Sequence, residues 1–184
     1  MLCLIFVVVL AAFPELHATE FGDLIEMVNT TEEIWLYSST AMRTDYECAY
    51  NKKDSLDCTE RFCSYKYGYN YTTGTARKEE TRDATLLDKC PMHPKTPCML
   101  RRKARAPIKM LLMFWDRDHH CGLFKAEGLT RRTECEIHAW NSAMLQYKTR
   151  ITQFLSCEER FYNYCNKTEY TQKVYYSESC RTQK

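Results

Sequence analysis

The sequence predicts an all-β protein, an eight-stranded antiparallel barrel that is stapled by disulfides and carries one C-terminal α-helix packed outside it. Three observations support this fold. Seven or eight short segments rich in aromatic and apolar residues follow one another, separated by polar turns. After Lys148 the apolar residues change to the spacing of a helix. Eleven cysteines indicate a disulfide-bonded chain from an oxidising compartment.

The strands are expected one after another, following a short helical or extended lead-in at residues 20–28. Residues 33–40, EIWLYSST, have the aromatic and apolar content of a strand. Residues 77–87 have a weaker β character, and residues 96–104 have the weakest strand signal. The remaining strand segments are residues 46–51, 60–72, 106–116, 120–127 and 133–140.

A helix is expected after the last strand. Between Lys148 and Tyr164, roughly helical spacing relates Ile151, Phe154, Leu155 and Tyr162, which predicts a helix of about fifteen residues. Residues 173–180, KVYYSESC, then predict a final extended segment. A run of strands followed by one helix is the arrangement found in lipocalins. An eight-stranded barrel has room inside for one small ligand.

A stripe of tyrosines marks one face of the third strand. Tyr65, Tyr67, Tyr69 and Tyr71 alternate with other residues, so all four share a face. Asn70 belongs to an N-glycosylation sequon and is expected on the solvent face, which places the tyrosines inside. They either pack as a core or line a cavity, where a polar ligand can partner their hydroxyls.

Residues 1–18 predict a signal peptide, because an apolar run too short to span a bilayer precedes the cleavage site Leu16-His17-Ala18. The remainder, residues 19–184, is then one lipocalin domain without Cys3, and its cysteine count is even. Sequons at Asn29, Asn70 and Asn166 predict glycosylation. We therefore expect a secreted, extracellular, monomeric protein with no membrane span.

Several function classes have no support. A formal net charge of +2 predicts no nucleic-acid partner. The motifs of serine hydrolases, zinc proteases and P-loop enzymes are missing, so we expect neither an enzyme nor a bound cofactor. Asp116, Asp118, His119 and His120 suggest a metal site, but a polar hairpin turn is the better interpretation.

Short motifs carry a family resemblance. They are Trp35-Leu36-Tyr37 on the first strand, HCGLF at residues 120–124, CEIHAW at 135–140 and VYYSESC at 174–180. The chain resembles the tick salivary lipocalins, the histamine-binding protein family. The resemblance implies that Cys48 pairs with Cys180 and Cys121 with Cys157, and that Cys135 pairs with Cys165 as in some members. The pairing of Cys58, Cys63, Cys90 and Cys98 stays open.

CEIHAW supplies the expected binding residues. Cys135, Ile137 and Ala139 share one face, and Glu136, His138 and Trp140 share the other. If Cys135 reaches a helix outside the barrel, Glu136, His138 and Trp140 point inward. The resemblance implies the same, because Glu136 occupies the position of the family's cavity acid. The sequence departs from the family at His138, where the family has Trp, and in lacking an acid-Ala-Trp motif near the N-terminus.

The inward carboxylate leaves the ligand open. A buried carboxylate needs a cationic partner. An amine such as histamine or serotonin would supply one, with Trp140 and the tyrosines adding cation–π contacts. Alternatively, Glu136 pairs inside the protein with His138, an Arg or a Lys. A leukotriene or another eicosanoid would instead use Arg or Lys and hydroxyl groups for its carboxylate.

A basic cluster allows a function of another class. Arg101, Arg102, Lys103 and Arg105 form either a solvated face or a contact for heparin or an acidic partner. Together with the extra cysteines between residues 58 and 98, this cluster suits a protein that inhibits host complement or another defence protein through its outer surface. The family resemblance favours capture of a small host mediator, which would help evade host defence.

Overall fold

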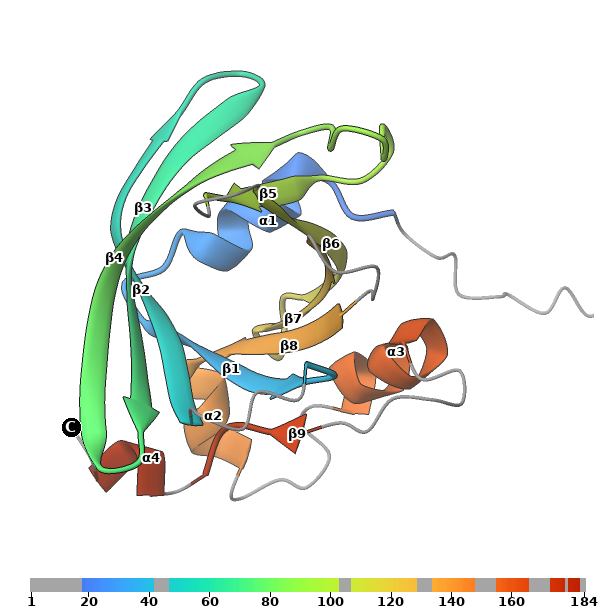
Figure 1. Cartoon of the computed structure of the whole chain (residues 1–184). Coiled ribbons are helices and arrows are strands. Elements are labelled where there is room, and N and C mark those ends of the chain that lie inside the picture. Colours follow the sequence, from blue (N-terminus) through green and yellow to red (C-terminus); the bar gives the residue numbers. More distant parts are fainter. Residues whose placement is uncertain are drawn as a thin grey trace, which may run out of the picture.

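The strands of the computed structural model close into a barrel (Figure 1). The structure describes residues 18–41, 47–102, 107–128, 134–147, 155–165, 173–177 and 179–182. Each strand pairs antiparallel with its neighbour along the chain, and β1 pairs with β2 and with β8, which closes the ring. The strands are β1 (Glu33–Ser39), β2 (Glu47–Cys58), β3 (Phe62–Thr73), β4 (Ala76–Leu87), β5 (Cys98–Arg101), β6 (Ile108–Asp116), β7 (Cys121–Glu127) and β8 (Glu134–Trp140). The predicted eight-stranded barrel is confirmed.

Helix α1 (Phe21–Val28) lies across one end of the barrel (Figure 1). Leu24, Met27 and Val28 are buried in the cluster that fills the barrel interior. Met27 fits against Gly122, where a β-carbon would lie only 2.6 Å from the Met27 sulfur. The lead-in expected to be helical or extended is therefore a helix that closes this end.

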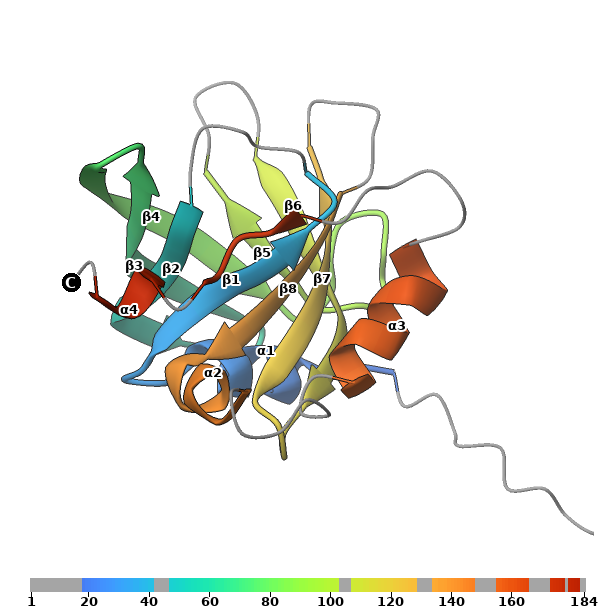
Figure 2. The same cartoon turned by 90° about the horizontal axis from the view of Figure 1, so that it is seen from below.

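The C-terminal part differs from the prediction. The expected helix over residues 148–164 is α3 (Leu155–Cys165), and residues 148–154 lie outside the described part. A second helix, α2 (Asn141–Tyr147), directly follows β8 and was not predicted. The extended segment at 173–180 contains only β9 (Lys173–Val174) before α4 (Ser179–Thr182). Helix α3 packs outside the barrel beside β7 and β8, as Figure 2 shows.

The seam between β1 and β2 is short. Only residues 33–35 of β1 pair with residues 50–52 of β2. Beyond them, Tyr175 bridges the two strands: its N–H donates to the Tyr37 carbonyl at 2.9 Å, and its carbonyl accepts from the Cys48 N–H at 3.1 Å. The C-terminal segment thus fills the gap between β1 and β2 as a short additional strand would.

Five disulfides join the ten described cysteines. Cys48–Cys180, Cys121–Cys157 and Cys135–Cys165 form as the family resemblance implied. The four open cysteines form two local bridges, Cys58–Cys63 and Cys90–Cys98, which staple neighbouring loops at the end closed by α1. This disulfide content fits an oxidising, extracellular compartment.

The prediction that Asn70 lies on a solvent face is wrong, because the side chain is buried. Asn70 lies on the opposite side of β3 from the tyrosines, but it is only 3% exposed, and its side-chain oxygen accepts a hydrogen bond from Arg77. Asn29 is exposed at the end of α1. Asn166 and residues 1–17 of the expected signal peptide lie outside the described residues. Within the described part, no helix combines the length and apolar character needed to cross a membrane.

Candidate functional site

The tyrosine stripe of β3 faces the barrel interior, as its spacing predicts. Tyr65, Tyr67 and Tyr69 are buried among the interior residues, and Tyr71 is partly buried at the end away from α1. The rings of Tyr65 and Tyr67 stack with their centroids 4.8 Å apart. Burial raises the pKa of the Tyr65 hydroxyl above its ordinary value, and the neighbouring Tyr67 adds to this effect. The Tyr65 phenol therefore enters any binding event as a neutral hydroxyl group.

Glu136 points inward from β8 and is only 1% exposed. Its Oε2 lies 2.9 Å from Nε2 of His138 and 3.9 Å from Nη1 of Arg101. His138 faces inward because it lies two residues further along the same strand, and Arg101 reaches the carboxylate from β5 across the barrel. The internal pairing of Glu136 with His138 and an arginine, one of the two alternatives, is the arrangement in this structure.

The basic cluster was predicted to be a solvated face or an outer contact, and for Arg101 this prediction is wrong. Its side chain is only 11% exposed and lies inside the barrel, whereas the next residue, Arg102, is exposed. Lys103 and Arg105 lie outside the described residues. Arg101 is the last residue of β5, and the inward side of that strand also carries Met99. The alternation Met99, Arg101 is the sequence signal that would have separated Arg101 from its basic neighbours.

A small cavity lies beside the Glu136 carboxylate. It measures about 10 Å³, room for one water molecule. Its polar walls come from Tyr69, Arg101, Glu136, His138 and Asn51, and its apolar walls come from Ile34, Leu36 and Ala49. Asn51 was not expected at the site. It lies inside because it is paired with Ile34 on β1 and Tyr69 on β3, both of which face the interior.

Trp140 occupies a different part of the barrel from Glu136. Its indole N–H donates to the Met27 carbonyl at 2.9 Å, and its ring stacks on His120 at 4.2 Å. The structure therefore places Trp140 against α1 at the closed end and does not bring it to the carboxylate. Trp115 lies beside it, with ring centroids 5.6 Å apart.

Buried polar atoms that make no hydrogen bond with the described chain include one atom on each of four interior residues. They are the hydroxyls of Tyr65 and Tyr67, Nε1 of Trp115 and Oδ1 of Asn51. All four residues face the barrel interior or its polar cavity. Buried polar groups are normally paired, so a row of unpaired ones along one interior suits a binding chamber for a partly polar molecule.

The acidic and histidine residues before β7 form a hairpin turn. Asp116 ends β6, and residues 117–120 make the turn into β7. The Asp116 carboxylate accepts hydrogen bonds from Ser156 of α3 and from His119. Nowhere in the described residues do three or more His, Cys, Asp or Glu side chains gather as a metal site would require. These residues tie α3 to the barrel.

The closed barrel and its interior polar groups define a lipocalin, a barrel built to hold a small molecule. The sequence profile of the family described as tick histamine binding protein matches residues 15–182, and the chain belongs to that family. The family consists of ligand-binding lipocalins and not of enzymes.

Two solved structures share the fold. The serotonin complex of AM182 superposes with a TM-score of 0.56 at 15% identity, covering 85% of this chain and 91% of that one. Japanin from Rhipicephalus appendiculatus, bound to cholesterol, gives a TM-score of 0.52 at 15% identity, covering 83% and 97%. A search of curated protein sequences finds no match.

Proposed function

We propose that this protein is a secreted salivary lipocalin that sequesters a small host mediator, and that its ligand is a lipid mediator with a carboxylate, such as an eicosanoid, and not a free amine. One observation supports this choice most strongly. The carboxylate of Glu136 already has a cation beside it, because Arg101 lies 3.9 Å away inside the barrel. Capture of this kind is stoichiometric and serves evasion of host inflammation.

The charges around Glu136 favour an anionic head group. An ammonium ion entering the cavity would meet the guanidinium of Arg101 and compete with it for Glu136. A carboxylate would instead gain a charge-assisted hydrogen bond from Arg101. The cavity holds about one water molecule, so the Arg101 side chain, the longest in its wall, must move as the head group binds.

The rest of the interior suits the rest of such a ligand. The aromatic faces of the β3 tyrosines and the aliphatic side chains of β1 offer apolar contact, and the hydroxyls of Tyr65 and Tyr67 offer hydrogen bonds. The related structures hold an amine in one case and a sterol in the other. The fold therefore accommodates both classes, and the choice for this chain depends on its own side chains.

Titration calorimetry against histamine, serotonin, arachidonic acid and a leukotriene tests the proposal. The acids should bind, and Arg101→Gln should weaken their binding roughly 10-fold or more, the scale of a hydrogen bond to a charged group. Arg102→Gln is the matched control, because Arg102 is the exposed neighbour and should leave affinity unchanged. Tighter binding of the amines, or equal effects of the two substitutions, would contradict an anion-binding site.

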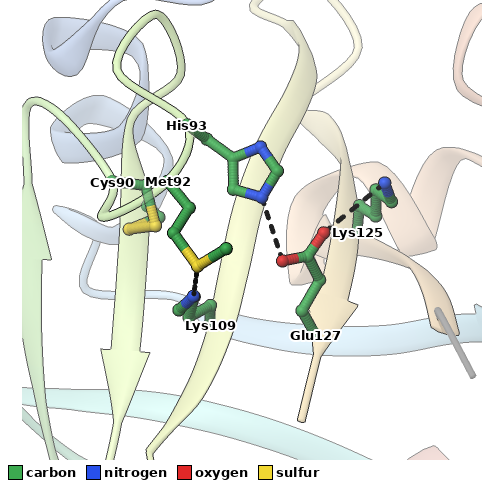
Figure 3. Close-up of polar contacts among 7 residues, drawn as sticks. Cys90, Met92, His93, Lys109, Lys125 and Glu127 are labelled. Atoms are coloured by element: carbon green, nitrogen blue, oxygen red, sulfur yellow. Dashed lines mark hydrogen bonds and ion pairs between the residues drawn. A yellow bond between two sulfur atoms is a disulfide. The ribbon is translucent and has the colours of Figure 1, made fainter. Parts of the chain in front are cut away.

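A second candidate function, inhibition of a host defence protein through the outer surface, has one specific observation in its favour. The ring closed by Cys90–Cys98 is pinned to β7 by His93, whose Nε2 lies 3.0 Å from the Glu127 carboxylate (Figure 3). The ring displays Met92, which is 86% exposed and has a left-handed backbone (φ 72°) at a turn position that favours glycine. A rigid loop that presents an apolar side chain is suited to binding a protein. Failure of every small molecule to bind would favour this candidate.

A further inference from the structure

Asn51 is a buried amide on β2 that faces the barrel interior. It is 6% exposed and lies between Ile34 of β1 and Tyr69 of β3. Its side-chain oxygen makes no hydrogen bond with any group in the described part of the chain. A buried amide oxygen is costly to leave unpaired, so a hydrophobic residue would suit this position better if it served packing alone.

A second buried asparagine, Asn70 on the neighbouring strand β3, differs from Asn51 in that its side-chain oxygen is paired. Asn70 lies on the outer side of β3, and its oxygen accepts a hydrogen bond from Arg77 at 3.3 Å. The fold therefore pairs the amide that points away from the cavity and leaves unpaired the amide that points into it. The unpaired Asn51 oxygen therefore faces the interior cavity, where a ligand can reach it.

The cavity beside Asn51 limits the group that can reach it. Arg101, Glu136 and His138 form its other polar walls. An amide oxygen accepts hydrogen bonds, so its partner must be a donor. A carboxylate cannot donate, and an ammonium ion would face Arg101 at close range. A hydroxyl group avoids both problems, because it is neutral and able to donate.

We infer that Asn51 is a specificity-determining residue whose Oδ1 accepts a hydrogen bond from a hydroxyl of the ligand, and that the ligand is a hydroxylated fatty acid. This inference rests on the proposed function, in which the carboxylate of the same ligand pairs with Arg101. Asn51 then separates hydroxylated mediators from their parent acid, because the parent acid leaves the buried oxygen unpaired.

The test compares arachidonic acid with its monohydroxy derivatives, which carry the hydroxyl near the carboxylate, in mid-chain or near the methyl end. Wild type should prefer at least one derivative by roughly 3- to 10-fold, the scale of one hydrogen bond. Asn51→Leu, which keeps the number and branching of the side-chain heavy atoms, should abolish this preference and raise the melting temperature of the ligand-free protein. Asn70→Leu is the matched control, which should lower the melting temperature and keep the preference.

The outcomes separate the inference from the proposed function. Equal binding of parent and hydroxylated acids by wild type would overturn the role of Asn51 and leave the anion site standing. A preference that survives Asn51→Leu, or a lower melting temperature of that variant, would also overturn it, because the amide would then be a structural residue. Binding of neither acid would overturn both conclusions.

Discussion

Replacing Glu136 by Gln should destabilise the ligand-free protein. The substitution keeps the shape of the side chain and an oxygen that accepts from His138, but it removes the negative charge beside Arg101. Two unit charges 3.9 Å apart attract by about 4 kcal/mol at an effective dielectric constant of about 20. The Arg101 side chain is only 11% exposed, so it can recover little of this energy from water. We expect a loss of about 2–4 kcal/mol in the free energy of unfolding.

Thermal melts near pH 7 measure this loss. In a chain of this length about 2–4 kcal/mol corresponds to a decrease of roughly 5–15 °C in melting temperature. Glu80→Gln is a matched control: Glu80 and Arg82 are only 2.8 Å apart, but both side chains are partly exposed. Its loss should not exceed about 1 kcal/mol. An unchanged or higher melting temperature of Glu136→Gln would refute the internal ion pair and restore Glu136 as a site for an amine.

Two further predictions follow from single residues. Burial raises the pKa of Asp116, but hydrogen bonds from Ser156 and His119 outweigh it and hold the pKa below its ordinary value. The stabilisation that ionised Asp116 provides is thus complete above about pH 4 and is lost as the pH falls through the lowered pKa. Ser156→Ala removes one of these hydrogen bonds, so the melting temperature of this variant should fall less between about pH 5 and pH 2 than that of wild type. An identical decrease in both proteins would contradict this. Exposed Asn29 should carry a glycan, and buried Asn70 should not. Peptide mass mapping of the secreted protein before and after glycosidase treatment checks this. A glycan on Asn70 would disprove its burial.

The barrel and the inward tyrosines could be predicted because they depend on local patterns. The period of two in β3 orients Tyr65, Tyr67 and Tyr69 together, and the same period in β8 sends Glu136 and His138 inward. Strand β2 was predicted too short, because its second half is polar and largely exposed, with its extended form held by pairing to β3. Polar sequence alone does not distinguish such a strand from a loop.

The partners inside the barrel could not be predicted, because they come from strands far apart in the sequence. Arg101 meets Glu136 only once the barrel closes, and its basic neighbours make it resemble a surface residue. The location of Asn51 depends on its pairing with Ile34 and Tyr69. Asn70 was misplaced for a similar reason, since the Arg77 side chain that covers it comes from the next strand.

The bridge that Tyr175 makes between β1 and β2 affects when the protein can fold during its synthesis. The barrel is held at this seam by a segment far downstream, and the Cys48–Cys180 disulfide beside it spans a sequence separation of 132. Ribosomes add roughly 5–20 residues per second, so β2 is made several seconds before the segment that secures it. Until then the edges of β1 and β2 stay largely open to pairing with other chains. The early strands therefore stay exposed to mispairing until the C-terminal segment has been made and has closed the seam.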